Sequence, residues 1–165
     1  MSYKYKILLI LAPVIFILDQ CTKYFVVKFI AIGDSIPVIP GFFDLIHVRN
    51  AGAAFGLFAN LPENARVSFF FGISGVALCI LIYVFRHLKA EDHYYAWPLS
   101  LVTGGVLGNF MDRIRYGNVV DFLSVHIQDK IIWGISMEWP AFNVADSAIT
   151  VSMILLAAHT LKSPK

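Results

Sequence analysis

Two acidic residues, Asp121 and Asp146, stand where an otherwise apolar chain should avoid charge. Asp121 follows an apolar segment by the short link "RYGNVV", and Asp146 lies within the last apolar segment. Two carboxylates held close together in a partly dry site cannot both ionise easily, so they share a proton. The ionised partner can take a proton from a water molecule that attacks a peptide carbonyl, while the protonated partner donates to the carbonyl oxygen. Such a pair could hydrolyse a peptide bond.

Polar and small side chains accompany these aspartates at helical spacing. On a helix, positions i, i+3, i+4 and i+7 share a face. Two such stripes are present, Asn143, Asp146, Ser147 and Thr150 in the last apolar segment and Gly105, Gly108, Asn109 and Asp112 in the one before it. Gly104 and Gly108 also form a small-xxx-small pair, which predicts that another helix packs closely against them. We expect both stripes to face into the protein, toward one end of the helices.

A turn and a helix start decide whether Asp121 and Asp146 can meet. Gly117 and Asn118 suit a turn that folds the chain back over the end of the preceding helix. If the last helix begins near Pro140, Asp146 lies about two turns inside it, roughly 9 Å from its start at a rise of about 1.5 Å per residue. The two carboxylates are therefore expected to converge at one end of a helical bundle.

The composition is that of a membrane protein. Of the 165 residues, 58% are hydrophobic and 15% are charged, whereas soluble domains are about half apolar and about a quarter charged. A membrane span needs roughly 20 mainly apolar residues. The sequence predicts an all-α integral membrane protein that forms a single membrane-embedded domain over residues 1–165. Its four transmembrane helices are expected over about residues 6–29, 66–86, 95–114 and 141–161.

Two long connections, about residues 30–65 and 115–140, separate these helices. The stretch "FFDLIHVRN" in the first of them predicts short strands. Basic residues are densest beside the two termini and the short turn at 87–94, which places the termini in the cytoplasm and the long connections outside it. The net charge of +2 and the lack of a basic block argue against a nucleic-acid partner.

Simpler roles also fit the charged residues taken one by one. A single aspartate near a helix end is often a helix cap or an ion-pair partner. Asp19 and Lys23, at i and i+4, most simply form an intrahelical pair, and Asp112 beside Arg113 could be structural. Arg113 could equally bind a carbonyl or a phosphate with its fork of donors.

Three other kinds of function fit the sequence less well. A serine peptidase would need Ser74 of "GISG" beside His159, but the two lie at different depths of their predicted helices. The histidines are scattered without metal-ligand spacing, so we expect neither a metal nor a cofactor. A proton-coupled transporter or channel would spread its carboxylates along a path through the bilayer, whereas these gather at one end.

Five sequence blocks, in order and spacing, resemble the signature blocks of lipoprotein signal peptidase, the type II signal peptidase of bacteria. The blocks are "LDQCTK" (18–23), "RNAGAAFG" (49–56), "GNFMDR" (108–113), "VVDF" (119–122) and "PAFNVADSAI" (140–149). One block alone would be weak, because a string such as "VVDF" occurs anywhere. Five in order, from the first predicted helix to the fourth, are specific.

The resemblance implies a four-helix aspartyl endopeptidase of the bacterial inner membrane, with a small extracytoplasmic β-cradle built from the loop after the first helix. It implies a monomer that lies among membrane lipids, with its active site near the extracytoplasmic face. The implied substrate is a prolipoprotein whose lipobox cysteine already bears diacylglycerol. The enzyme would cut just before that cysteine and release the signal peptide.

The resemblance also implies roles for residues of the matching blocks. Asp121 and Asp146 become the catalytic pair. Asn50, Asn109, Arg113 and Asn143 become supporting groups that hold substrate or orient the pair, and Asp19 and Asp112 become structural or supporting groups.

Overall fold

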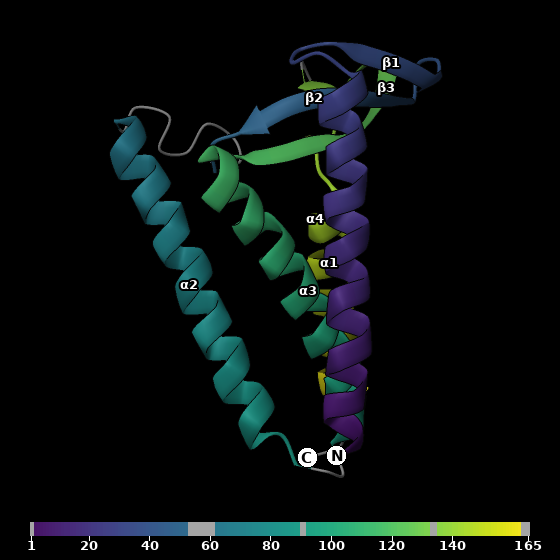
Figure 1. The fold of residues 1–165 in the computed structure, drawn as a ribbon. Helices are drawn as coiled ribbons and strands as arrows, with labels where there is room; N and C mark the ends of the chain where they lie inside the picture. The colour runs from purple at the N-terminus through teal and green to yellow at the C-terminus, as the bar shows by residue number, and fades with distance from the viewer. Residues whose placement is uncertain (1, 53–61, 90–91, 133–134, 163–165) are drawn as a thin grey trace.

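The computed structural model describes residues 2–52, 62–89, 92–132 and 135–162. Within these ranges the chain forms four helices, α1 (Tyr3–Phe29), α2 (Glu63–His87), α3 (His93–Tyr116) and α4 (Val144–Lys162). It also forms four strands, β1 (Ser35–Ile39), β2 (Phe43–Asn50), β3 (Val119–Ile132) and β4 (Ile135–Glu138). The sheet covers one end of the helical bundle, and both termini lie at the opposite end (Figure 1).

The four expected helices are present, and all four begin and end within about three residues of the predicted bounds. The depth expected for Asp146 was wrong, because it assumed a start near Pro140, whereas α4 begins at Val144. Phe142 instead forms an isolated bridge to Leu123, with backbone bonds in both directions. The backbone before α4 is therefore held against the sheet, and Asp146 lies in the first turn of α4 rather than two turns inside it.

Helices α1, α2 and α4 are long and apolar enough to cross a membrane. Helix α3 is 24 residues long but does not meet that test, since its sequence is less apolar and ends in charged residues. Its position explains the difference: α3 contacts each of the other three helices, so less of its surface faces away from protein. Helix α2 has the largest share of its surface facing away from protein, because only its Ser74 and Phe85 are buried.

The sheet is antiparallel in the order β1-β2-β3-β4. The expected strand in the first long connection is present as β2. The loop after the first helix, from which a β-cradle was expected, supplies β1 and β2, while β3 and β4 come from the second long connection. Gly117 ends α3 in the left-handed conformation, with φ of +70°, and its N–H bonds to the carbonyl of Arg113. This turn starts β3 over the end of α3, as the "RYGN" segment predicted.

Glycines allow α3 to lie close to its neighbours. A Cβ added at Gly104 would lie 2.7 Å from the carbonyl oxygen of Ala12 in α1, and one added at Gly105 would lie 2.6 Å from that of Ala145 in α4. At Gly108 it would collide with the carboxylate of Asp19. The predicted close approach of a helix to Gly104 and Gly108 is confirmed, and that helix is α1.

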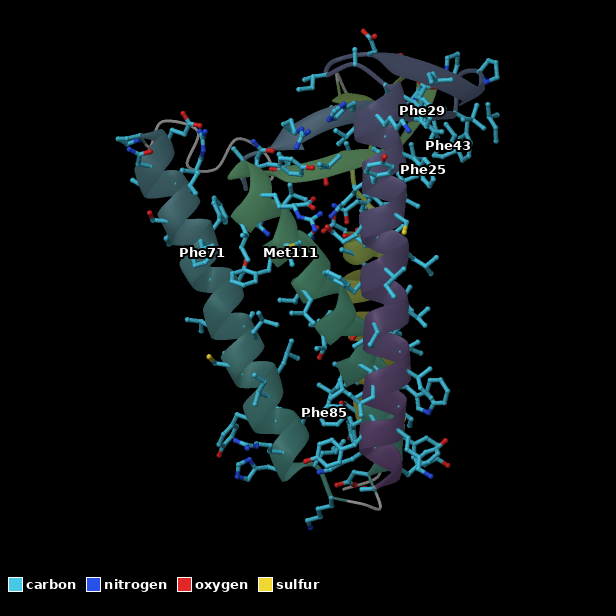
Figure 2. The ribbon with its side chains drawn as sticks, in the orientation of Figure 1. Phe25, Phe29, Phe43, Phe71, Phe85 and Met111 are labelled. Carbon is cyan, nitrogen blue, oxygen red and sulfur yellow. The ribbon has the colours of Figure 1, made fainter. Side chains whose placement is uncertain are left out.

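Apolar clusters hold the two ends of the bundle. At the end near the termini, Ile7, Phe85, Ala96 and Leu99 form a buried cluster, and Phe85 lies at that end in Figure 2. Lys4 also donates to the carbonyls of Phe85 (3.0 Å) and Arg86, and so ties α1 to the C-terminus of α2. Farther along, Phe71 of α2 packs on Phe110 of α3, with ring centroids 4.8 Å apart. Under the sheet, Val26, Ile30, Val120 and Phe122 form the second cluster.

The substitution Gly105→Ala should destabilise the protein by about 1–3 kcal/mol, because its methyl group would push α3 away from the backbone of α4. The free energy of unfolding in one detergent measures this effect. Gly72→Ala in α2 is the matched control, since nothing lies within 4 Å of its added Cβ. Alanine has the better helix propensity, so the control should be neutral or slightly stabilising. Equal effects of the two substitutions would contradict the close packing described for Gly105.

Candidate active site

Asp121 lies on β3 and is almost fully buried, with 2% of its surface exposed. One of its oxygens, Oδ2, accepts a hydrogen bond from Asn50 Nδ2 at 2.9 Å. The other, Oδ1, accepts one from Asn143 Nδ2 at 2.8 Å. The register of the sheet explains the first contact: Asn50 pairs with Val119, and both side chains lie on the face of the sheet that Asp121 occupies.

Asp146 is positioned by the N-terminus of α4. Asn143 is the residue before the helix, and its Oδ1 accepts the N–H of Asp146 at 2.9 Å. In return Asp146 Oδ2 accepts the N–H of Asn143 at 3.2 Å. These reciprocal bonds form a capping box. The helix N-terminus also stabilises negative charge at this position.

Asn143 and Asn109 connect the two aspartates. Asn143 is fully buried, and it bonds to Asp121 through its side chain and to Asp146 through both its backbone and its side chain. Asn109 Nδ2 donates to Asp146 Oδ1 at 2.8 Å, while Asn109 Oδ1 accepts a bond from Asn143 Nδ2 at 3.2 Å. The structure therefore gathers Asp121, Asp146, Asn50, Asn109 and Asn143 at one place.

Asp121 and Asp146 line the same cavity, whose volume is about 770 Å³. Asn50 and Ala51 lie on its sheet side, and Ser147 and Thr150 continue the polar stripe of α4 along its wall. The remaining lining residues include the apolar side chains Val48, Trp139, Phe142 and Val151. A cavity of this size, mainly apolar with a few convergent polar groups, is typical of a ligand site.

The environment raises the pKa of Asp121 from its usual value near 3.8 to about 7. Burial is the main cause, and the negative charge of Asp146 adds to it. The hydrogen bonds from Asn50 and Asn143 and the positive charge of Lys23 act in the opposite direction. Asp121 can therefore hold a proton near neutral pH.

Asp19 and Asp112 lie deeper in the bundle and do not line the cavity. Both are buried and both form ion pairs with Lys23, at 2.8 Å and 3.0 Å. Asp19 Oδ1 also accepts the N–H of Ala145 at 2.9 Å, and Asp112 Oδ2 accepts the N–H of Val120 at 3.0 Å. Each of these carboxylates thus holds the backbone next to one of the two candidate catalytic aspartates.

Arg113 is close to the site but is not bonded to its carboxylates in the described part of the chain. Its Nη1 donates to the carbonyl of Asn109 at 3.2 Å, and its guanidinium lies 5.9 Å from the ring centroid of Phe70. The charges of Asp146, Asp112 and Asp121 all act on it. Of the "RNAGAAFG" block, residues 53–56 lie outside the described residues; Arg49, Asn50 and Ala51 line the cavity, and Asn50 also bonds to Asp121.

The serine alternative finds no support in the geometry. Ser74 donates to the carbonyl of Phe70 within its own helix. The ring of His159 contacts Tyr94 and Tyr95, which lie in the first turn of α3 at the end of the bundle near the termini. Among the described residues, no group of three or more His, Cys, Asp or Glu side chains is arranged to hold a metal ion.

Lys23 and Gln20 belong to this polar region but were not predicted as site residues. Gln20 Nε2 donates to Asp112 Oδ1 and to the carbonyl of Gly108. Lys23 was expected only as the partner of Asp19, yet it also contacts α3. The signal was available in the sequence, because a lysine and a glutamine inside a membrane helix are costly unless they are paired.

The fold and the site together define a helical membrane protein whose cavity holds two aspartates joined by asparagines. The family model for signal peptidase II matches residues 11–162. A lipoprotein signal peptidase of Syntrophotalea carbinolica is 44% identical over 156 residues, which cover 93% of this chain and 91% of that protein. One of Geobacter metallireducens is 39% identical and covers 100% of this chain and 96% of that protein.

A solved structure of a bacterial membrane enzyme, obtained by the in meso method at 1.9 Å resolution, is also similar. It has a TM-score of 0.80 and 36% sequence identity, covering 99% of this chain and 97% of that one. The chain therefore belongs to the signal peptidase II family, as its five sequence blocks predicted, and it is a membrane peptidase.

The substitution Asn143→Ala should destabilise the protein by at least about 2 kcal/mol. It removes the helix cap, worth about 1 kcal/mol. It also leaves the buried Oδ1 of Asp121 and the N–H of Asp146 without the hydrogen bonds that the Asn143 side chain supplies, at about 1–3 kcal/mol. Asn118→Ala is the control, because that half-buried side chain donates to the carbonyl of Tyr116 in the turn after α3 and, among the described residues, bonds to neither aspartate. Unfolding of both variants in the same detergent measures the difference, and a loss at Asn143 no larger than at Asn118 would rule out its capping role.

Proposed function

We propose that the protein is an aspartyl endopeptidase that removes the signal peptide from diacylglyceryl-modified prolipoproteins by cleaving just before the lipidated cysteine. The observation that carries the proposal is that Asp121 and Asp146 line one cavity and are both bonded to Asn143. The substrate class is supported by the relatives, which are lipoprotein signal peptidases.

In the proposed reaction Asp146 is the base and Asp121 is the acid. Asp146, which accepts bonds from Asn109 Nδ2 and the Asn143 N–H at a helix N-terminus, takes a proton from the attacking water. Asp121, whose pKa is raised to about 7, donates its proton to the carbonyl oxygen of the scissile bond. Collapse of the tetrahedral intermediate breaks the carbon–nitrogen bond, and the proton held by Asp146 passes to the leaving amine of the cysteine. One hydroxyl of the intermediate returns its proton to Asp121 as the new carboxyl group forms, so that both aspartates regain their starting states.

Supporting roles follow from the contacts of each residue. Asn50 and Asn143 hold the carboxyl group of Asp121, and Asn109 holds that of Asp146. Arg113 donates to the carbonyl of Asn109 in its own helix, and we propose that its remaining donors bind a carbonyl oxygen of the substrate. Asp19 and Asp112 accept the N–H groups of the residues that precede Asp146 and Asp121, and so hold the backbone beside each of them.

The location of the site suits such a substrate. We propose that α1 to α4 all cross the bacterial inner membrane, with the termini in the cytoplasm and the sheet outside it. Both termini lie at the end of the bundle opposite the sheet, which is compatible with this orientation (Figure 1). The acyl chains and signal helix of the substrate would stay in lipid while the scissile bond reaches water at the interface. We propose that the protein acts as a monomer and needs neither metal nor cofactor.

Cleavage of a diacylglyceryl-modified precursor by the purified chain tests the proposal. Asp121→Asn and Asp146→Asn should each lower kcat by about 10²- to 10⁴-fold, because each removes one of the two proton transfers. The same precursor without its lipid should be cut far more slowly. Asp34→Asn, at an exposed position between α1 and β1, is the matched control and should keep the full rate. Near-normal cleavage by either of the first two variants would refute the aspartyl mechanism.

The pH dependence of cleavage follows from the raised pKa of Asp121. The acid must be protonated to donate, so the rate should fall as pH rises through about 7, by up to about tenfold per pH unit. Initial rates measured from about two units below that pKa to about two units above it, in one lipid or detergent, give the profile. A rate that stays constant on the alkaline side would show that Asp121 does not supply this proton.

A further inference from the structure

Lys23 is buried near the middle of the polar region, with 3% of its side chain exposed. Its Nζ has three partners, Asp19 Oδ2 at 2.8 Å, Asp112 Oδ2 at 3.0 Å and Asn109 Oδ1 at 2.8 Å. An ammonium group has three donors. All three are used, so the lysine fixes the positions of its three partners rather than one alone.

Two of these partners hold the backbone beside the candidate catalytic aspartates. Asp112 Oδ2, which bonds to Lys23, also accepts the N–H of Val120, the residue before Asp121. Asp19, the other carboxylate, accepts the N–H of Ala145, the residue before Asp146. A single cation therefore connects two carboxylates, each of which anchors one side of the site.

The third partner is the side-chain amide of Asn109. Because an ammonium group can only donate, its contact requires that the oxygen of this amide face Lys23. The nitrogen of the same amide must then face Asp146, to whose Oδ1 it donates at 2.8 Å. Lys23, together with the longer bond from Asn143 Nδ2 to the same oxygen at 3.2 Å, thus sets Asn109 to present a donor, and not an acceptor, to Asp146.

We propose that Lys23 is a positioning residue for the reaction: through Asp19, Asp112 and Asn109 it holds both catalytic aspartates in working geometry and supplies positive charge beneath them. This inference rests on the proposed function, since it assigns a role within the same site. Besides Lys23, the charged groups around Asp121 in the described part of the chain include Asp146 of α4 and Arg113 of α3, whose charges act on it, and Arg49 of β2, which lines the same cavity. Lys23 favours the ionised form of Asp121, so its removal should raise the pKa of that group further.

The test compares cleavage of the diacylglyceryl-modified precursor by the wild-type chain and by Lys23→Met over a range of pH. The variant should lower kcat about 10- to 100-fold with KM nearly unchanged, because small displacements of catalytic groups act on the chemical step. The pH at which activity declines on the alkaline side should move upward. Lys23→Arg keeps the charge and should leave that pH closer to the wild-type value.

Lys4→Met is the matched control. Lys4 is also a buried lysine of α1 that donates to several oxygens, but its partners are carbonyls at the far end of the bundle. Its loss should lower stability and leave the pH profile where it was. If Lys23→Met changes kcat and the profile no more than Lys4→Met does, the proposal is overturned.

Two further outcomes are decisive. If Lys23→Met does not fold, Lys23→Gln is measured in the same way, since it lacks the charge but keeps a donor. If neither uncharged variant folds, the lysine is a requirement of folding and the positioning role is rejected. Should the wild-type chain cleave without needing Asp121 and Asp146, the proposed function itself fails, whatever the result at Lys23.

Discussion

The structure depends on keeping buried charge paired. Lys23, Asp19 and Asp112 are all almost fully buried between α1 and α3, where an unpaired charge would cost several kcal/mol. Each of the two carboxylates also accepts a backbone N–H from a neighbouring element. This pairing fixes how α1, α3, α4 and β3 sit together, because moving any one of them would leave a charge or an N–H without a partner. The region under the sheet is therefore held in one arrangement by electrostatics as much as by packing.

Close helix packing makes these short contacts possible. Gly108 leaves just enough room for the carboxylate of Asp19, and Gly105 lets the start of α4 lie against α3. Apolar clusters hold the bundle at both ends, one around Phe85 and one around Val120. The polar region lies between them, so its groups are shielded from water except where the cavity opens at Asp121 and Asp146. Apolar packing at the two ends of the bundle and charge pairing between them therefore stabilise the same arrangement of helices.

Much of the fold could be predicted from the sequence, because membrane helices leave a strong apolar signal and Gly117 marks a turn. The start of α4 could not, since the bridge between Phe142 and Leu123 depends on a strand far away in the sequence. The gathering of Asp121, Asp146 and Asn143 was foreseen from helical spacing and from family resemblance. Helical spacing did not predict that Asn143 caps α4, or that Lys23 bonds to Asn109 of α3. Both contacts depend on how neighbouring elements pack.

The pairing of β2 with β3 has a consequence for comparisons among relatives. β2 belongs to the connection after α1 and β3 to the connection after α3, yet Asn50 of one strand bonds to Asp121 of the other. The two long connections therefore form one structural unit that is split along the chain. Chimeras that exchange a single loop would join strands shaped for different partners. Grafting the site onto another member of the family requires both loops to be transferred together.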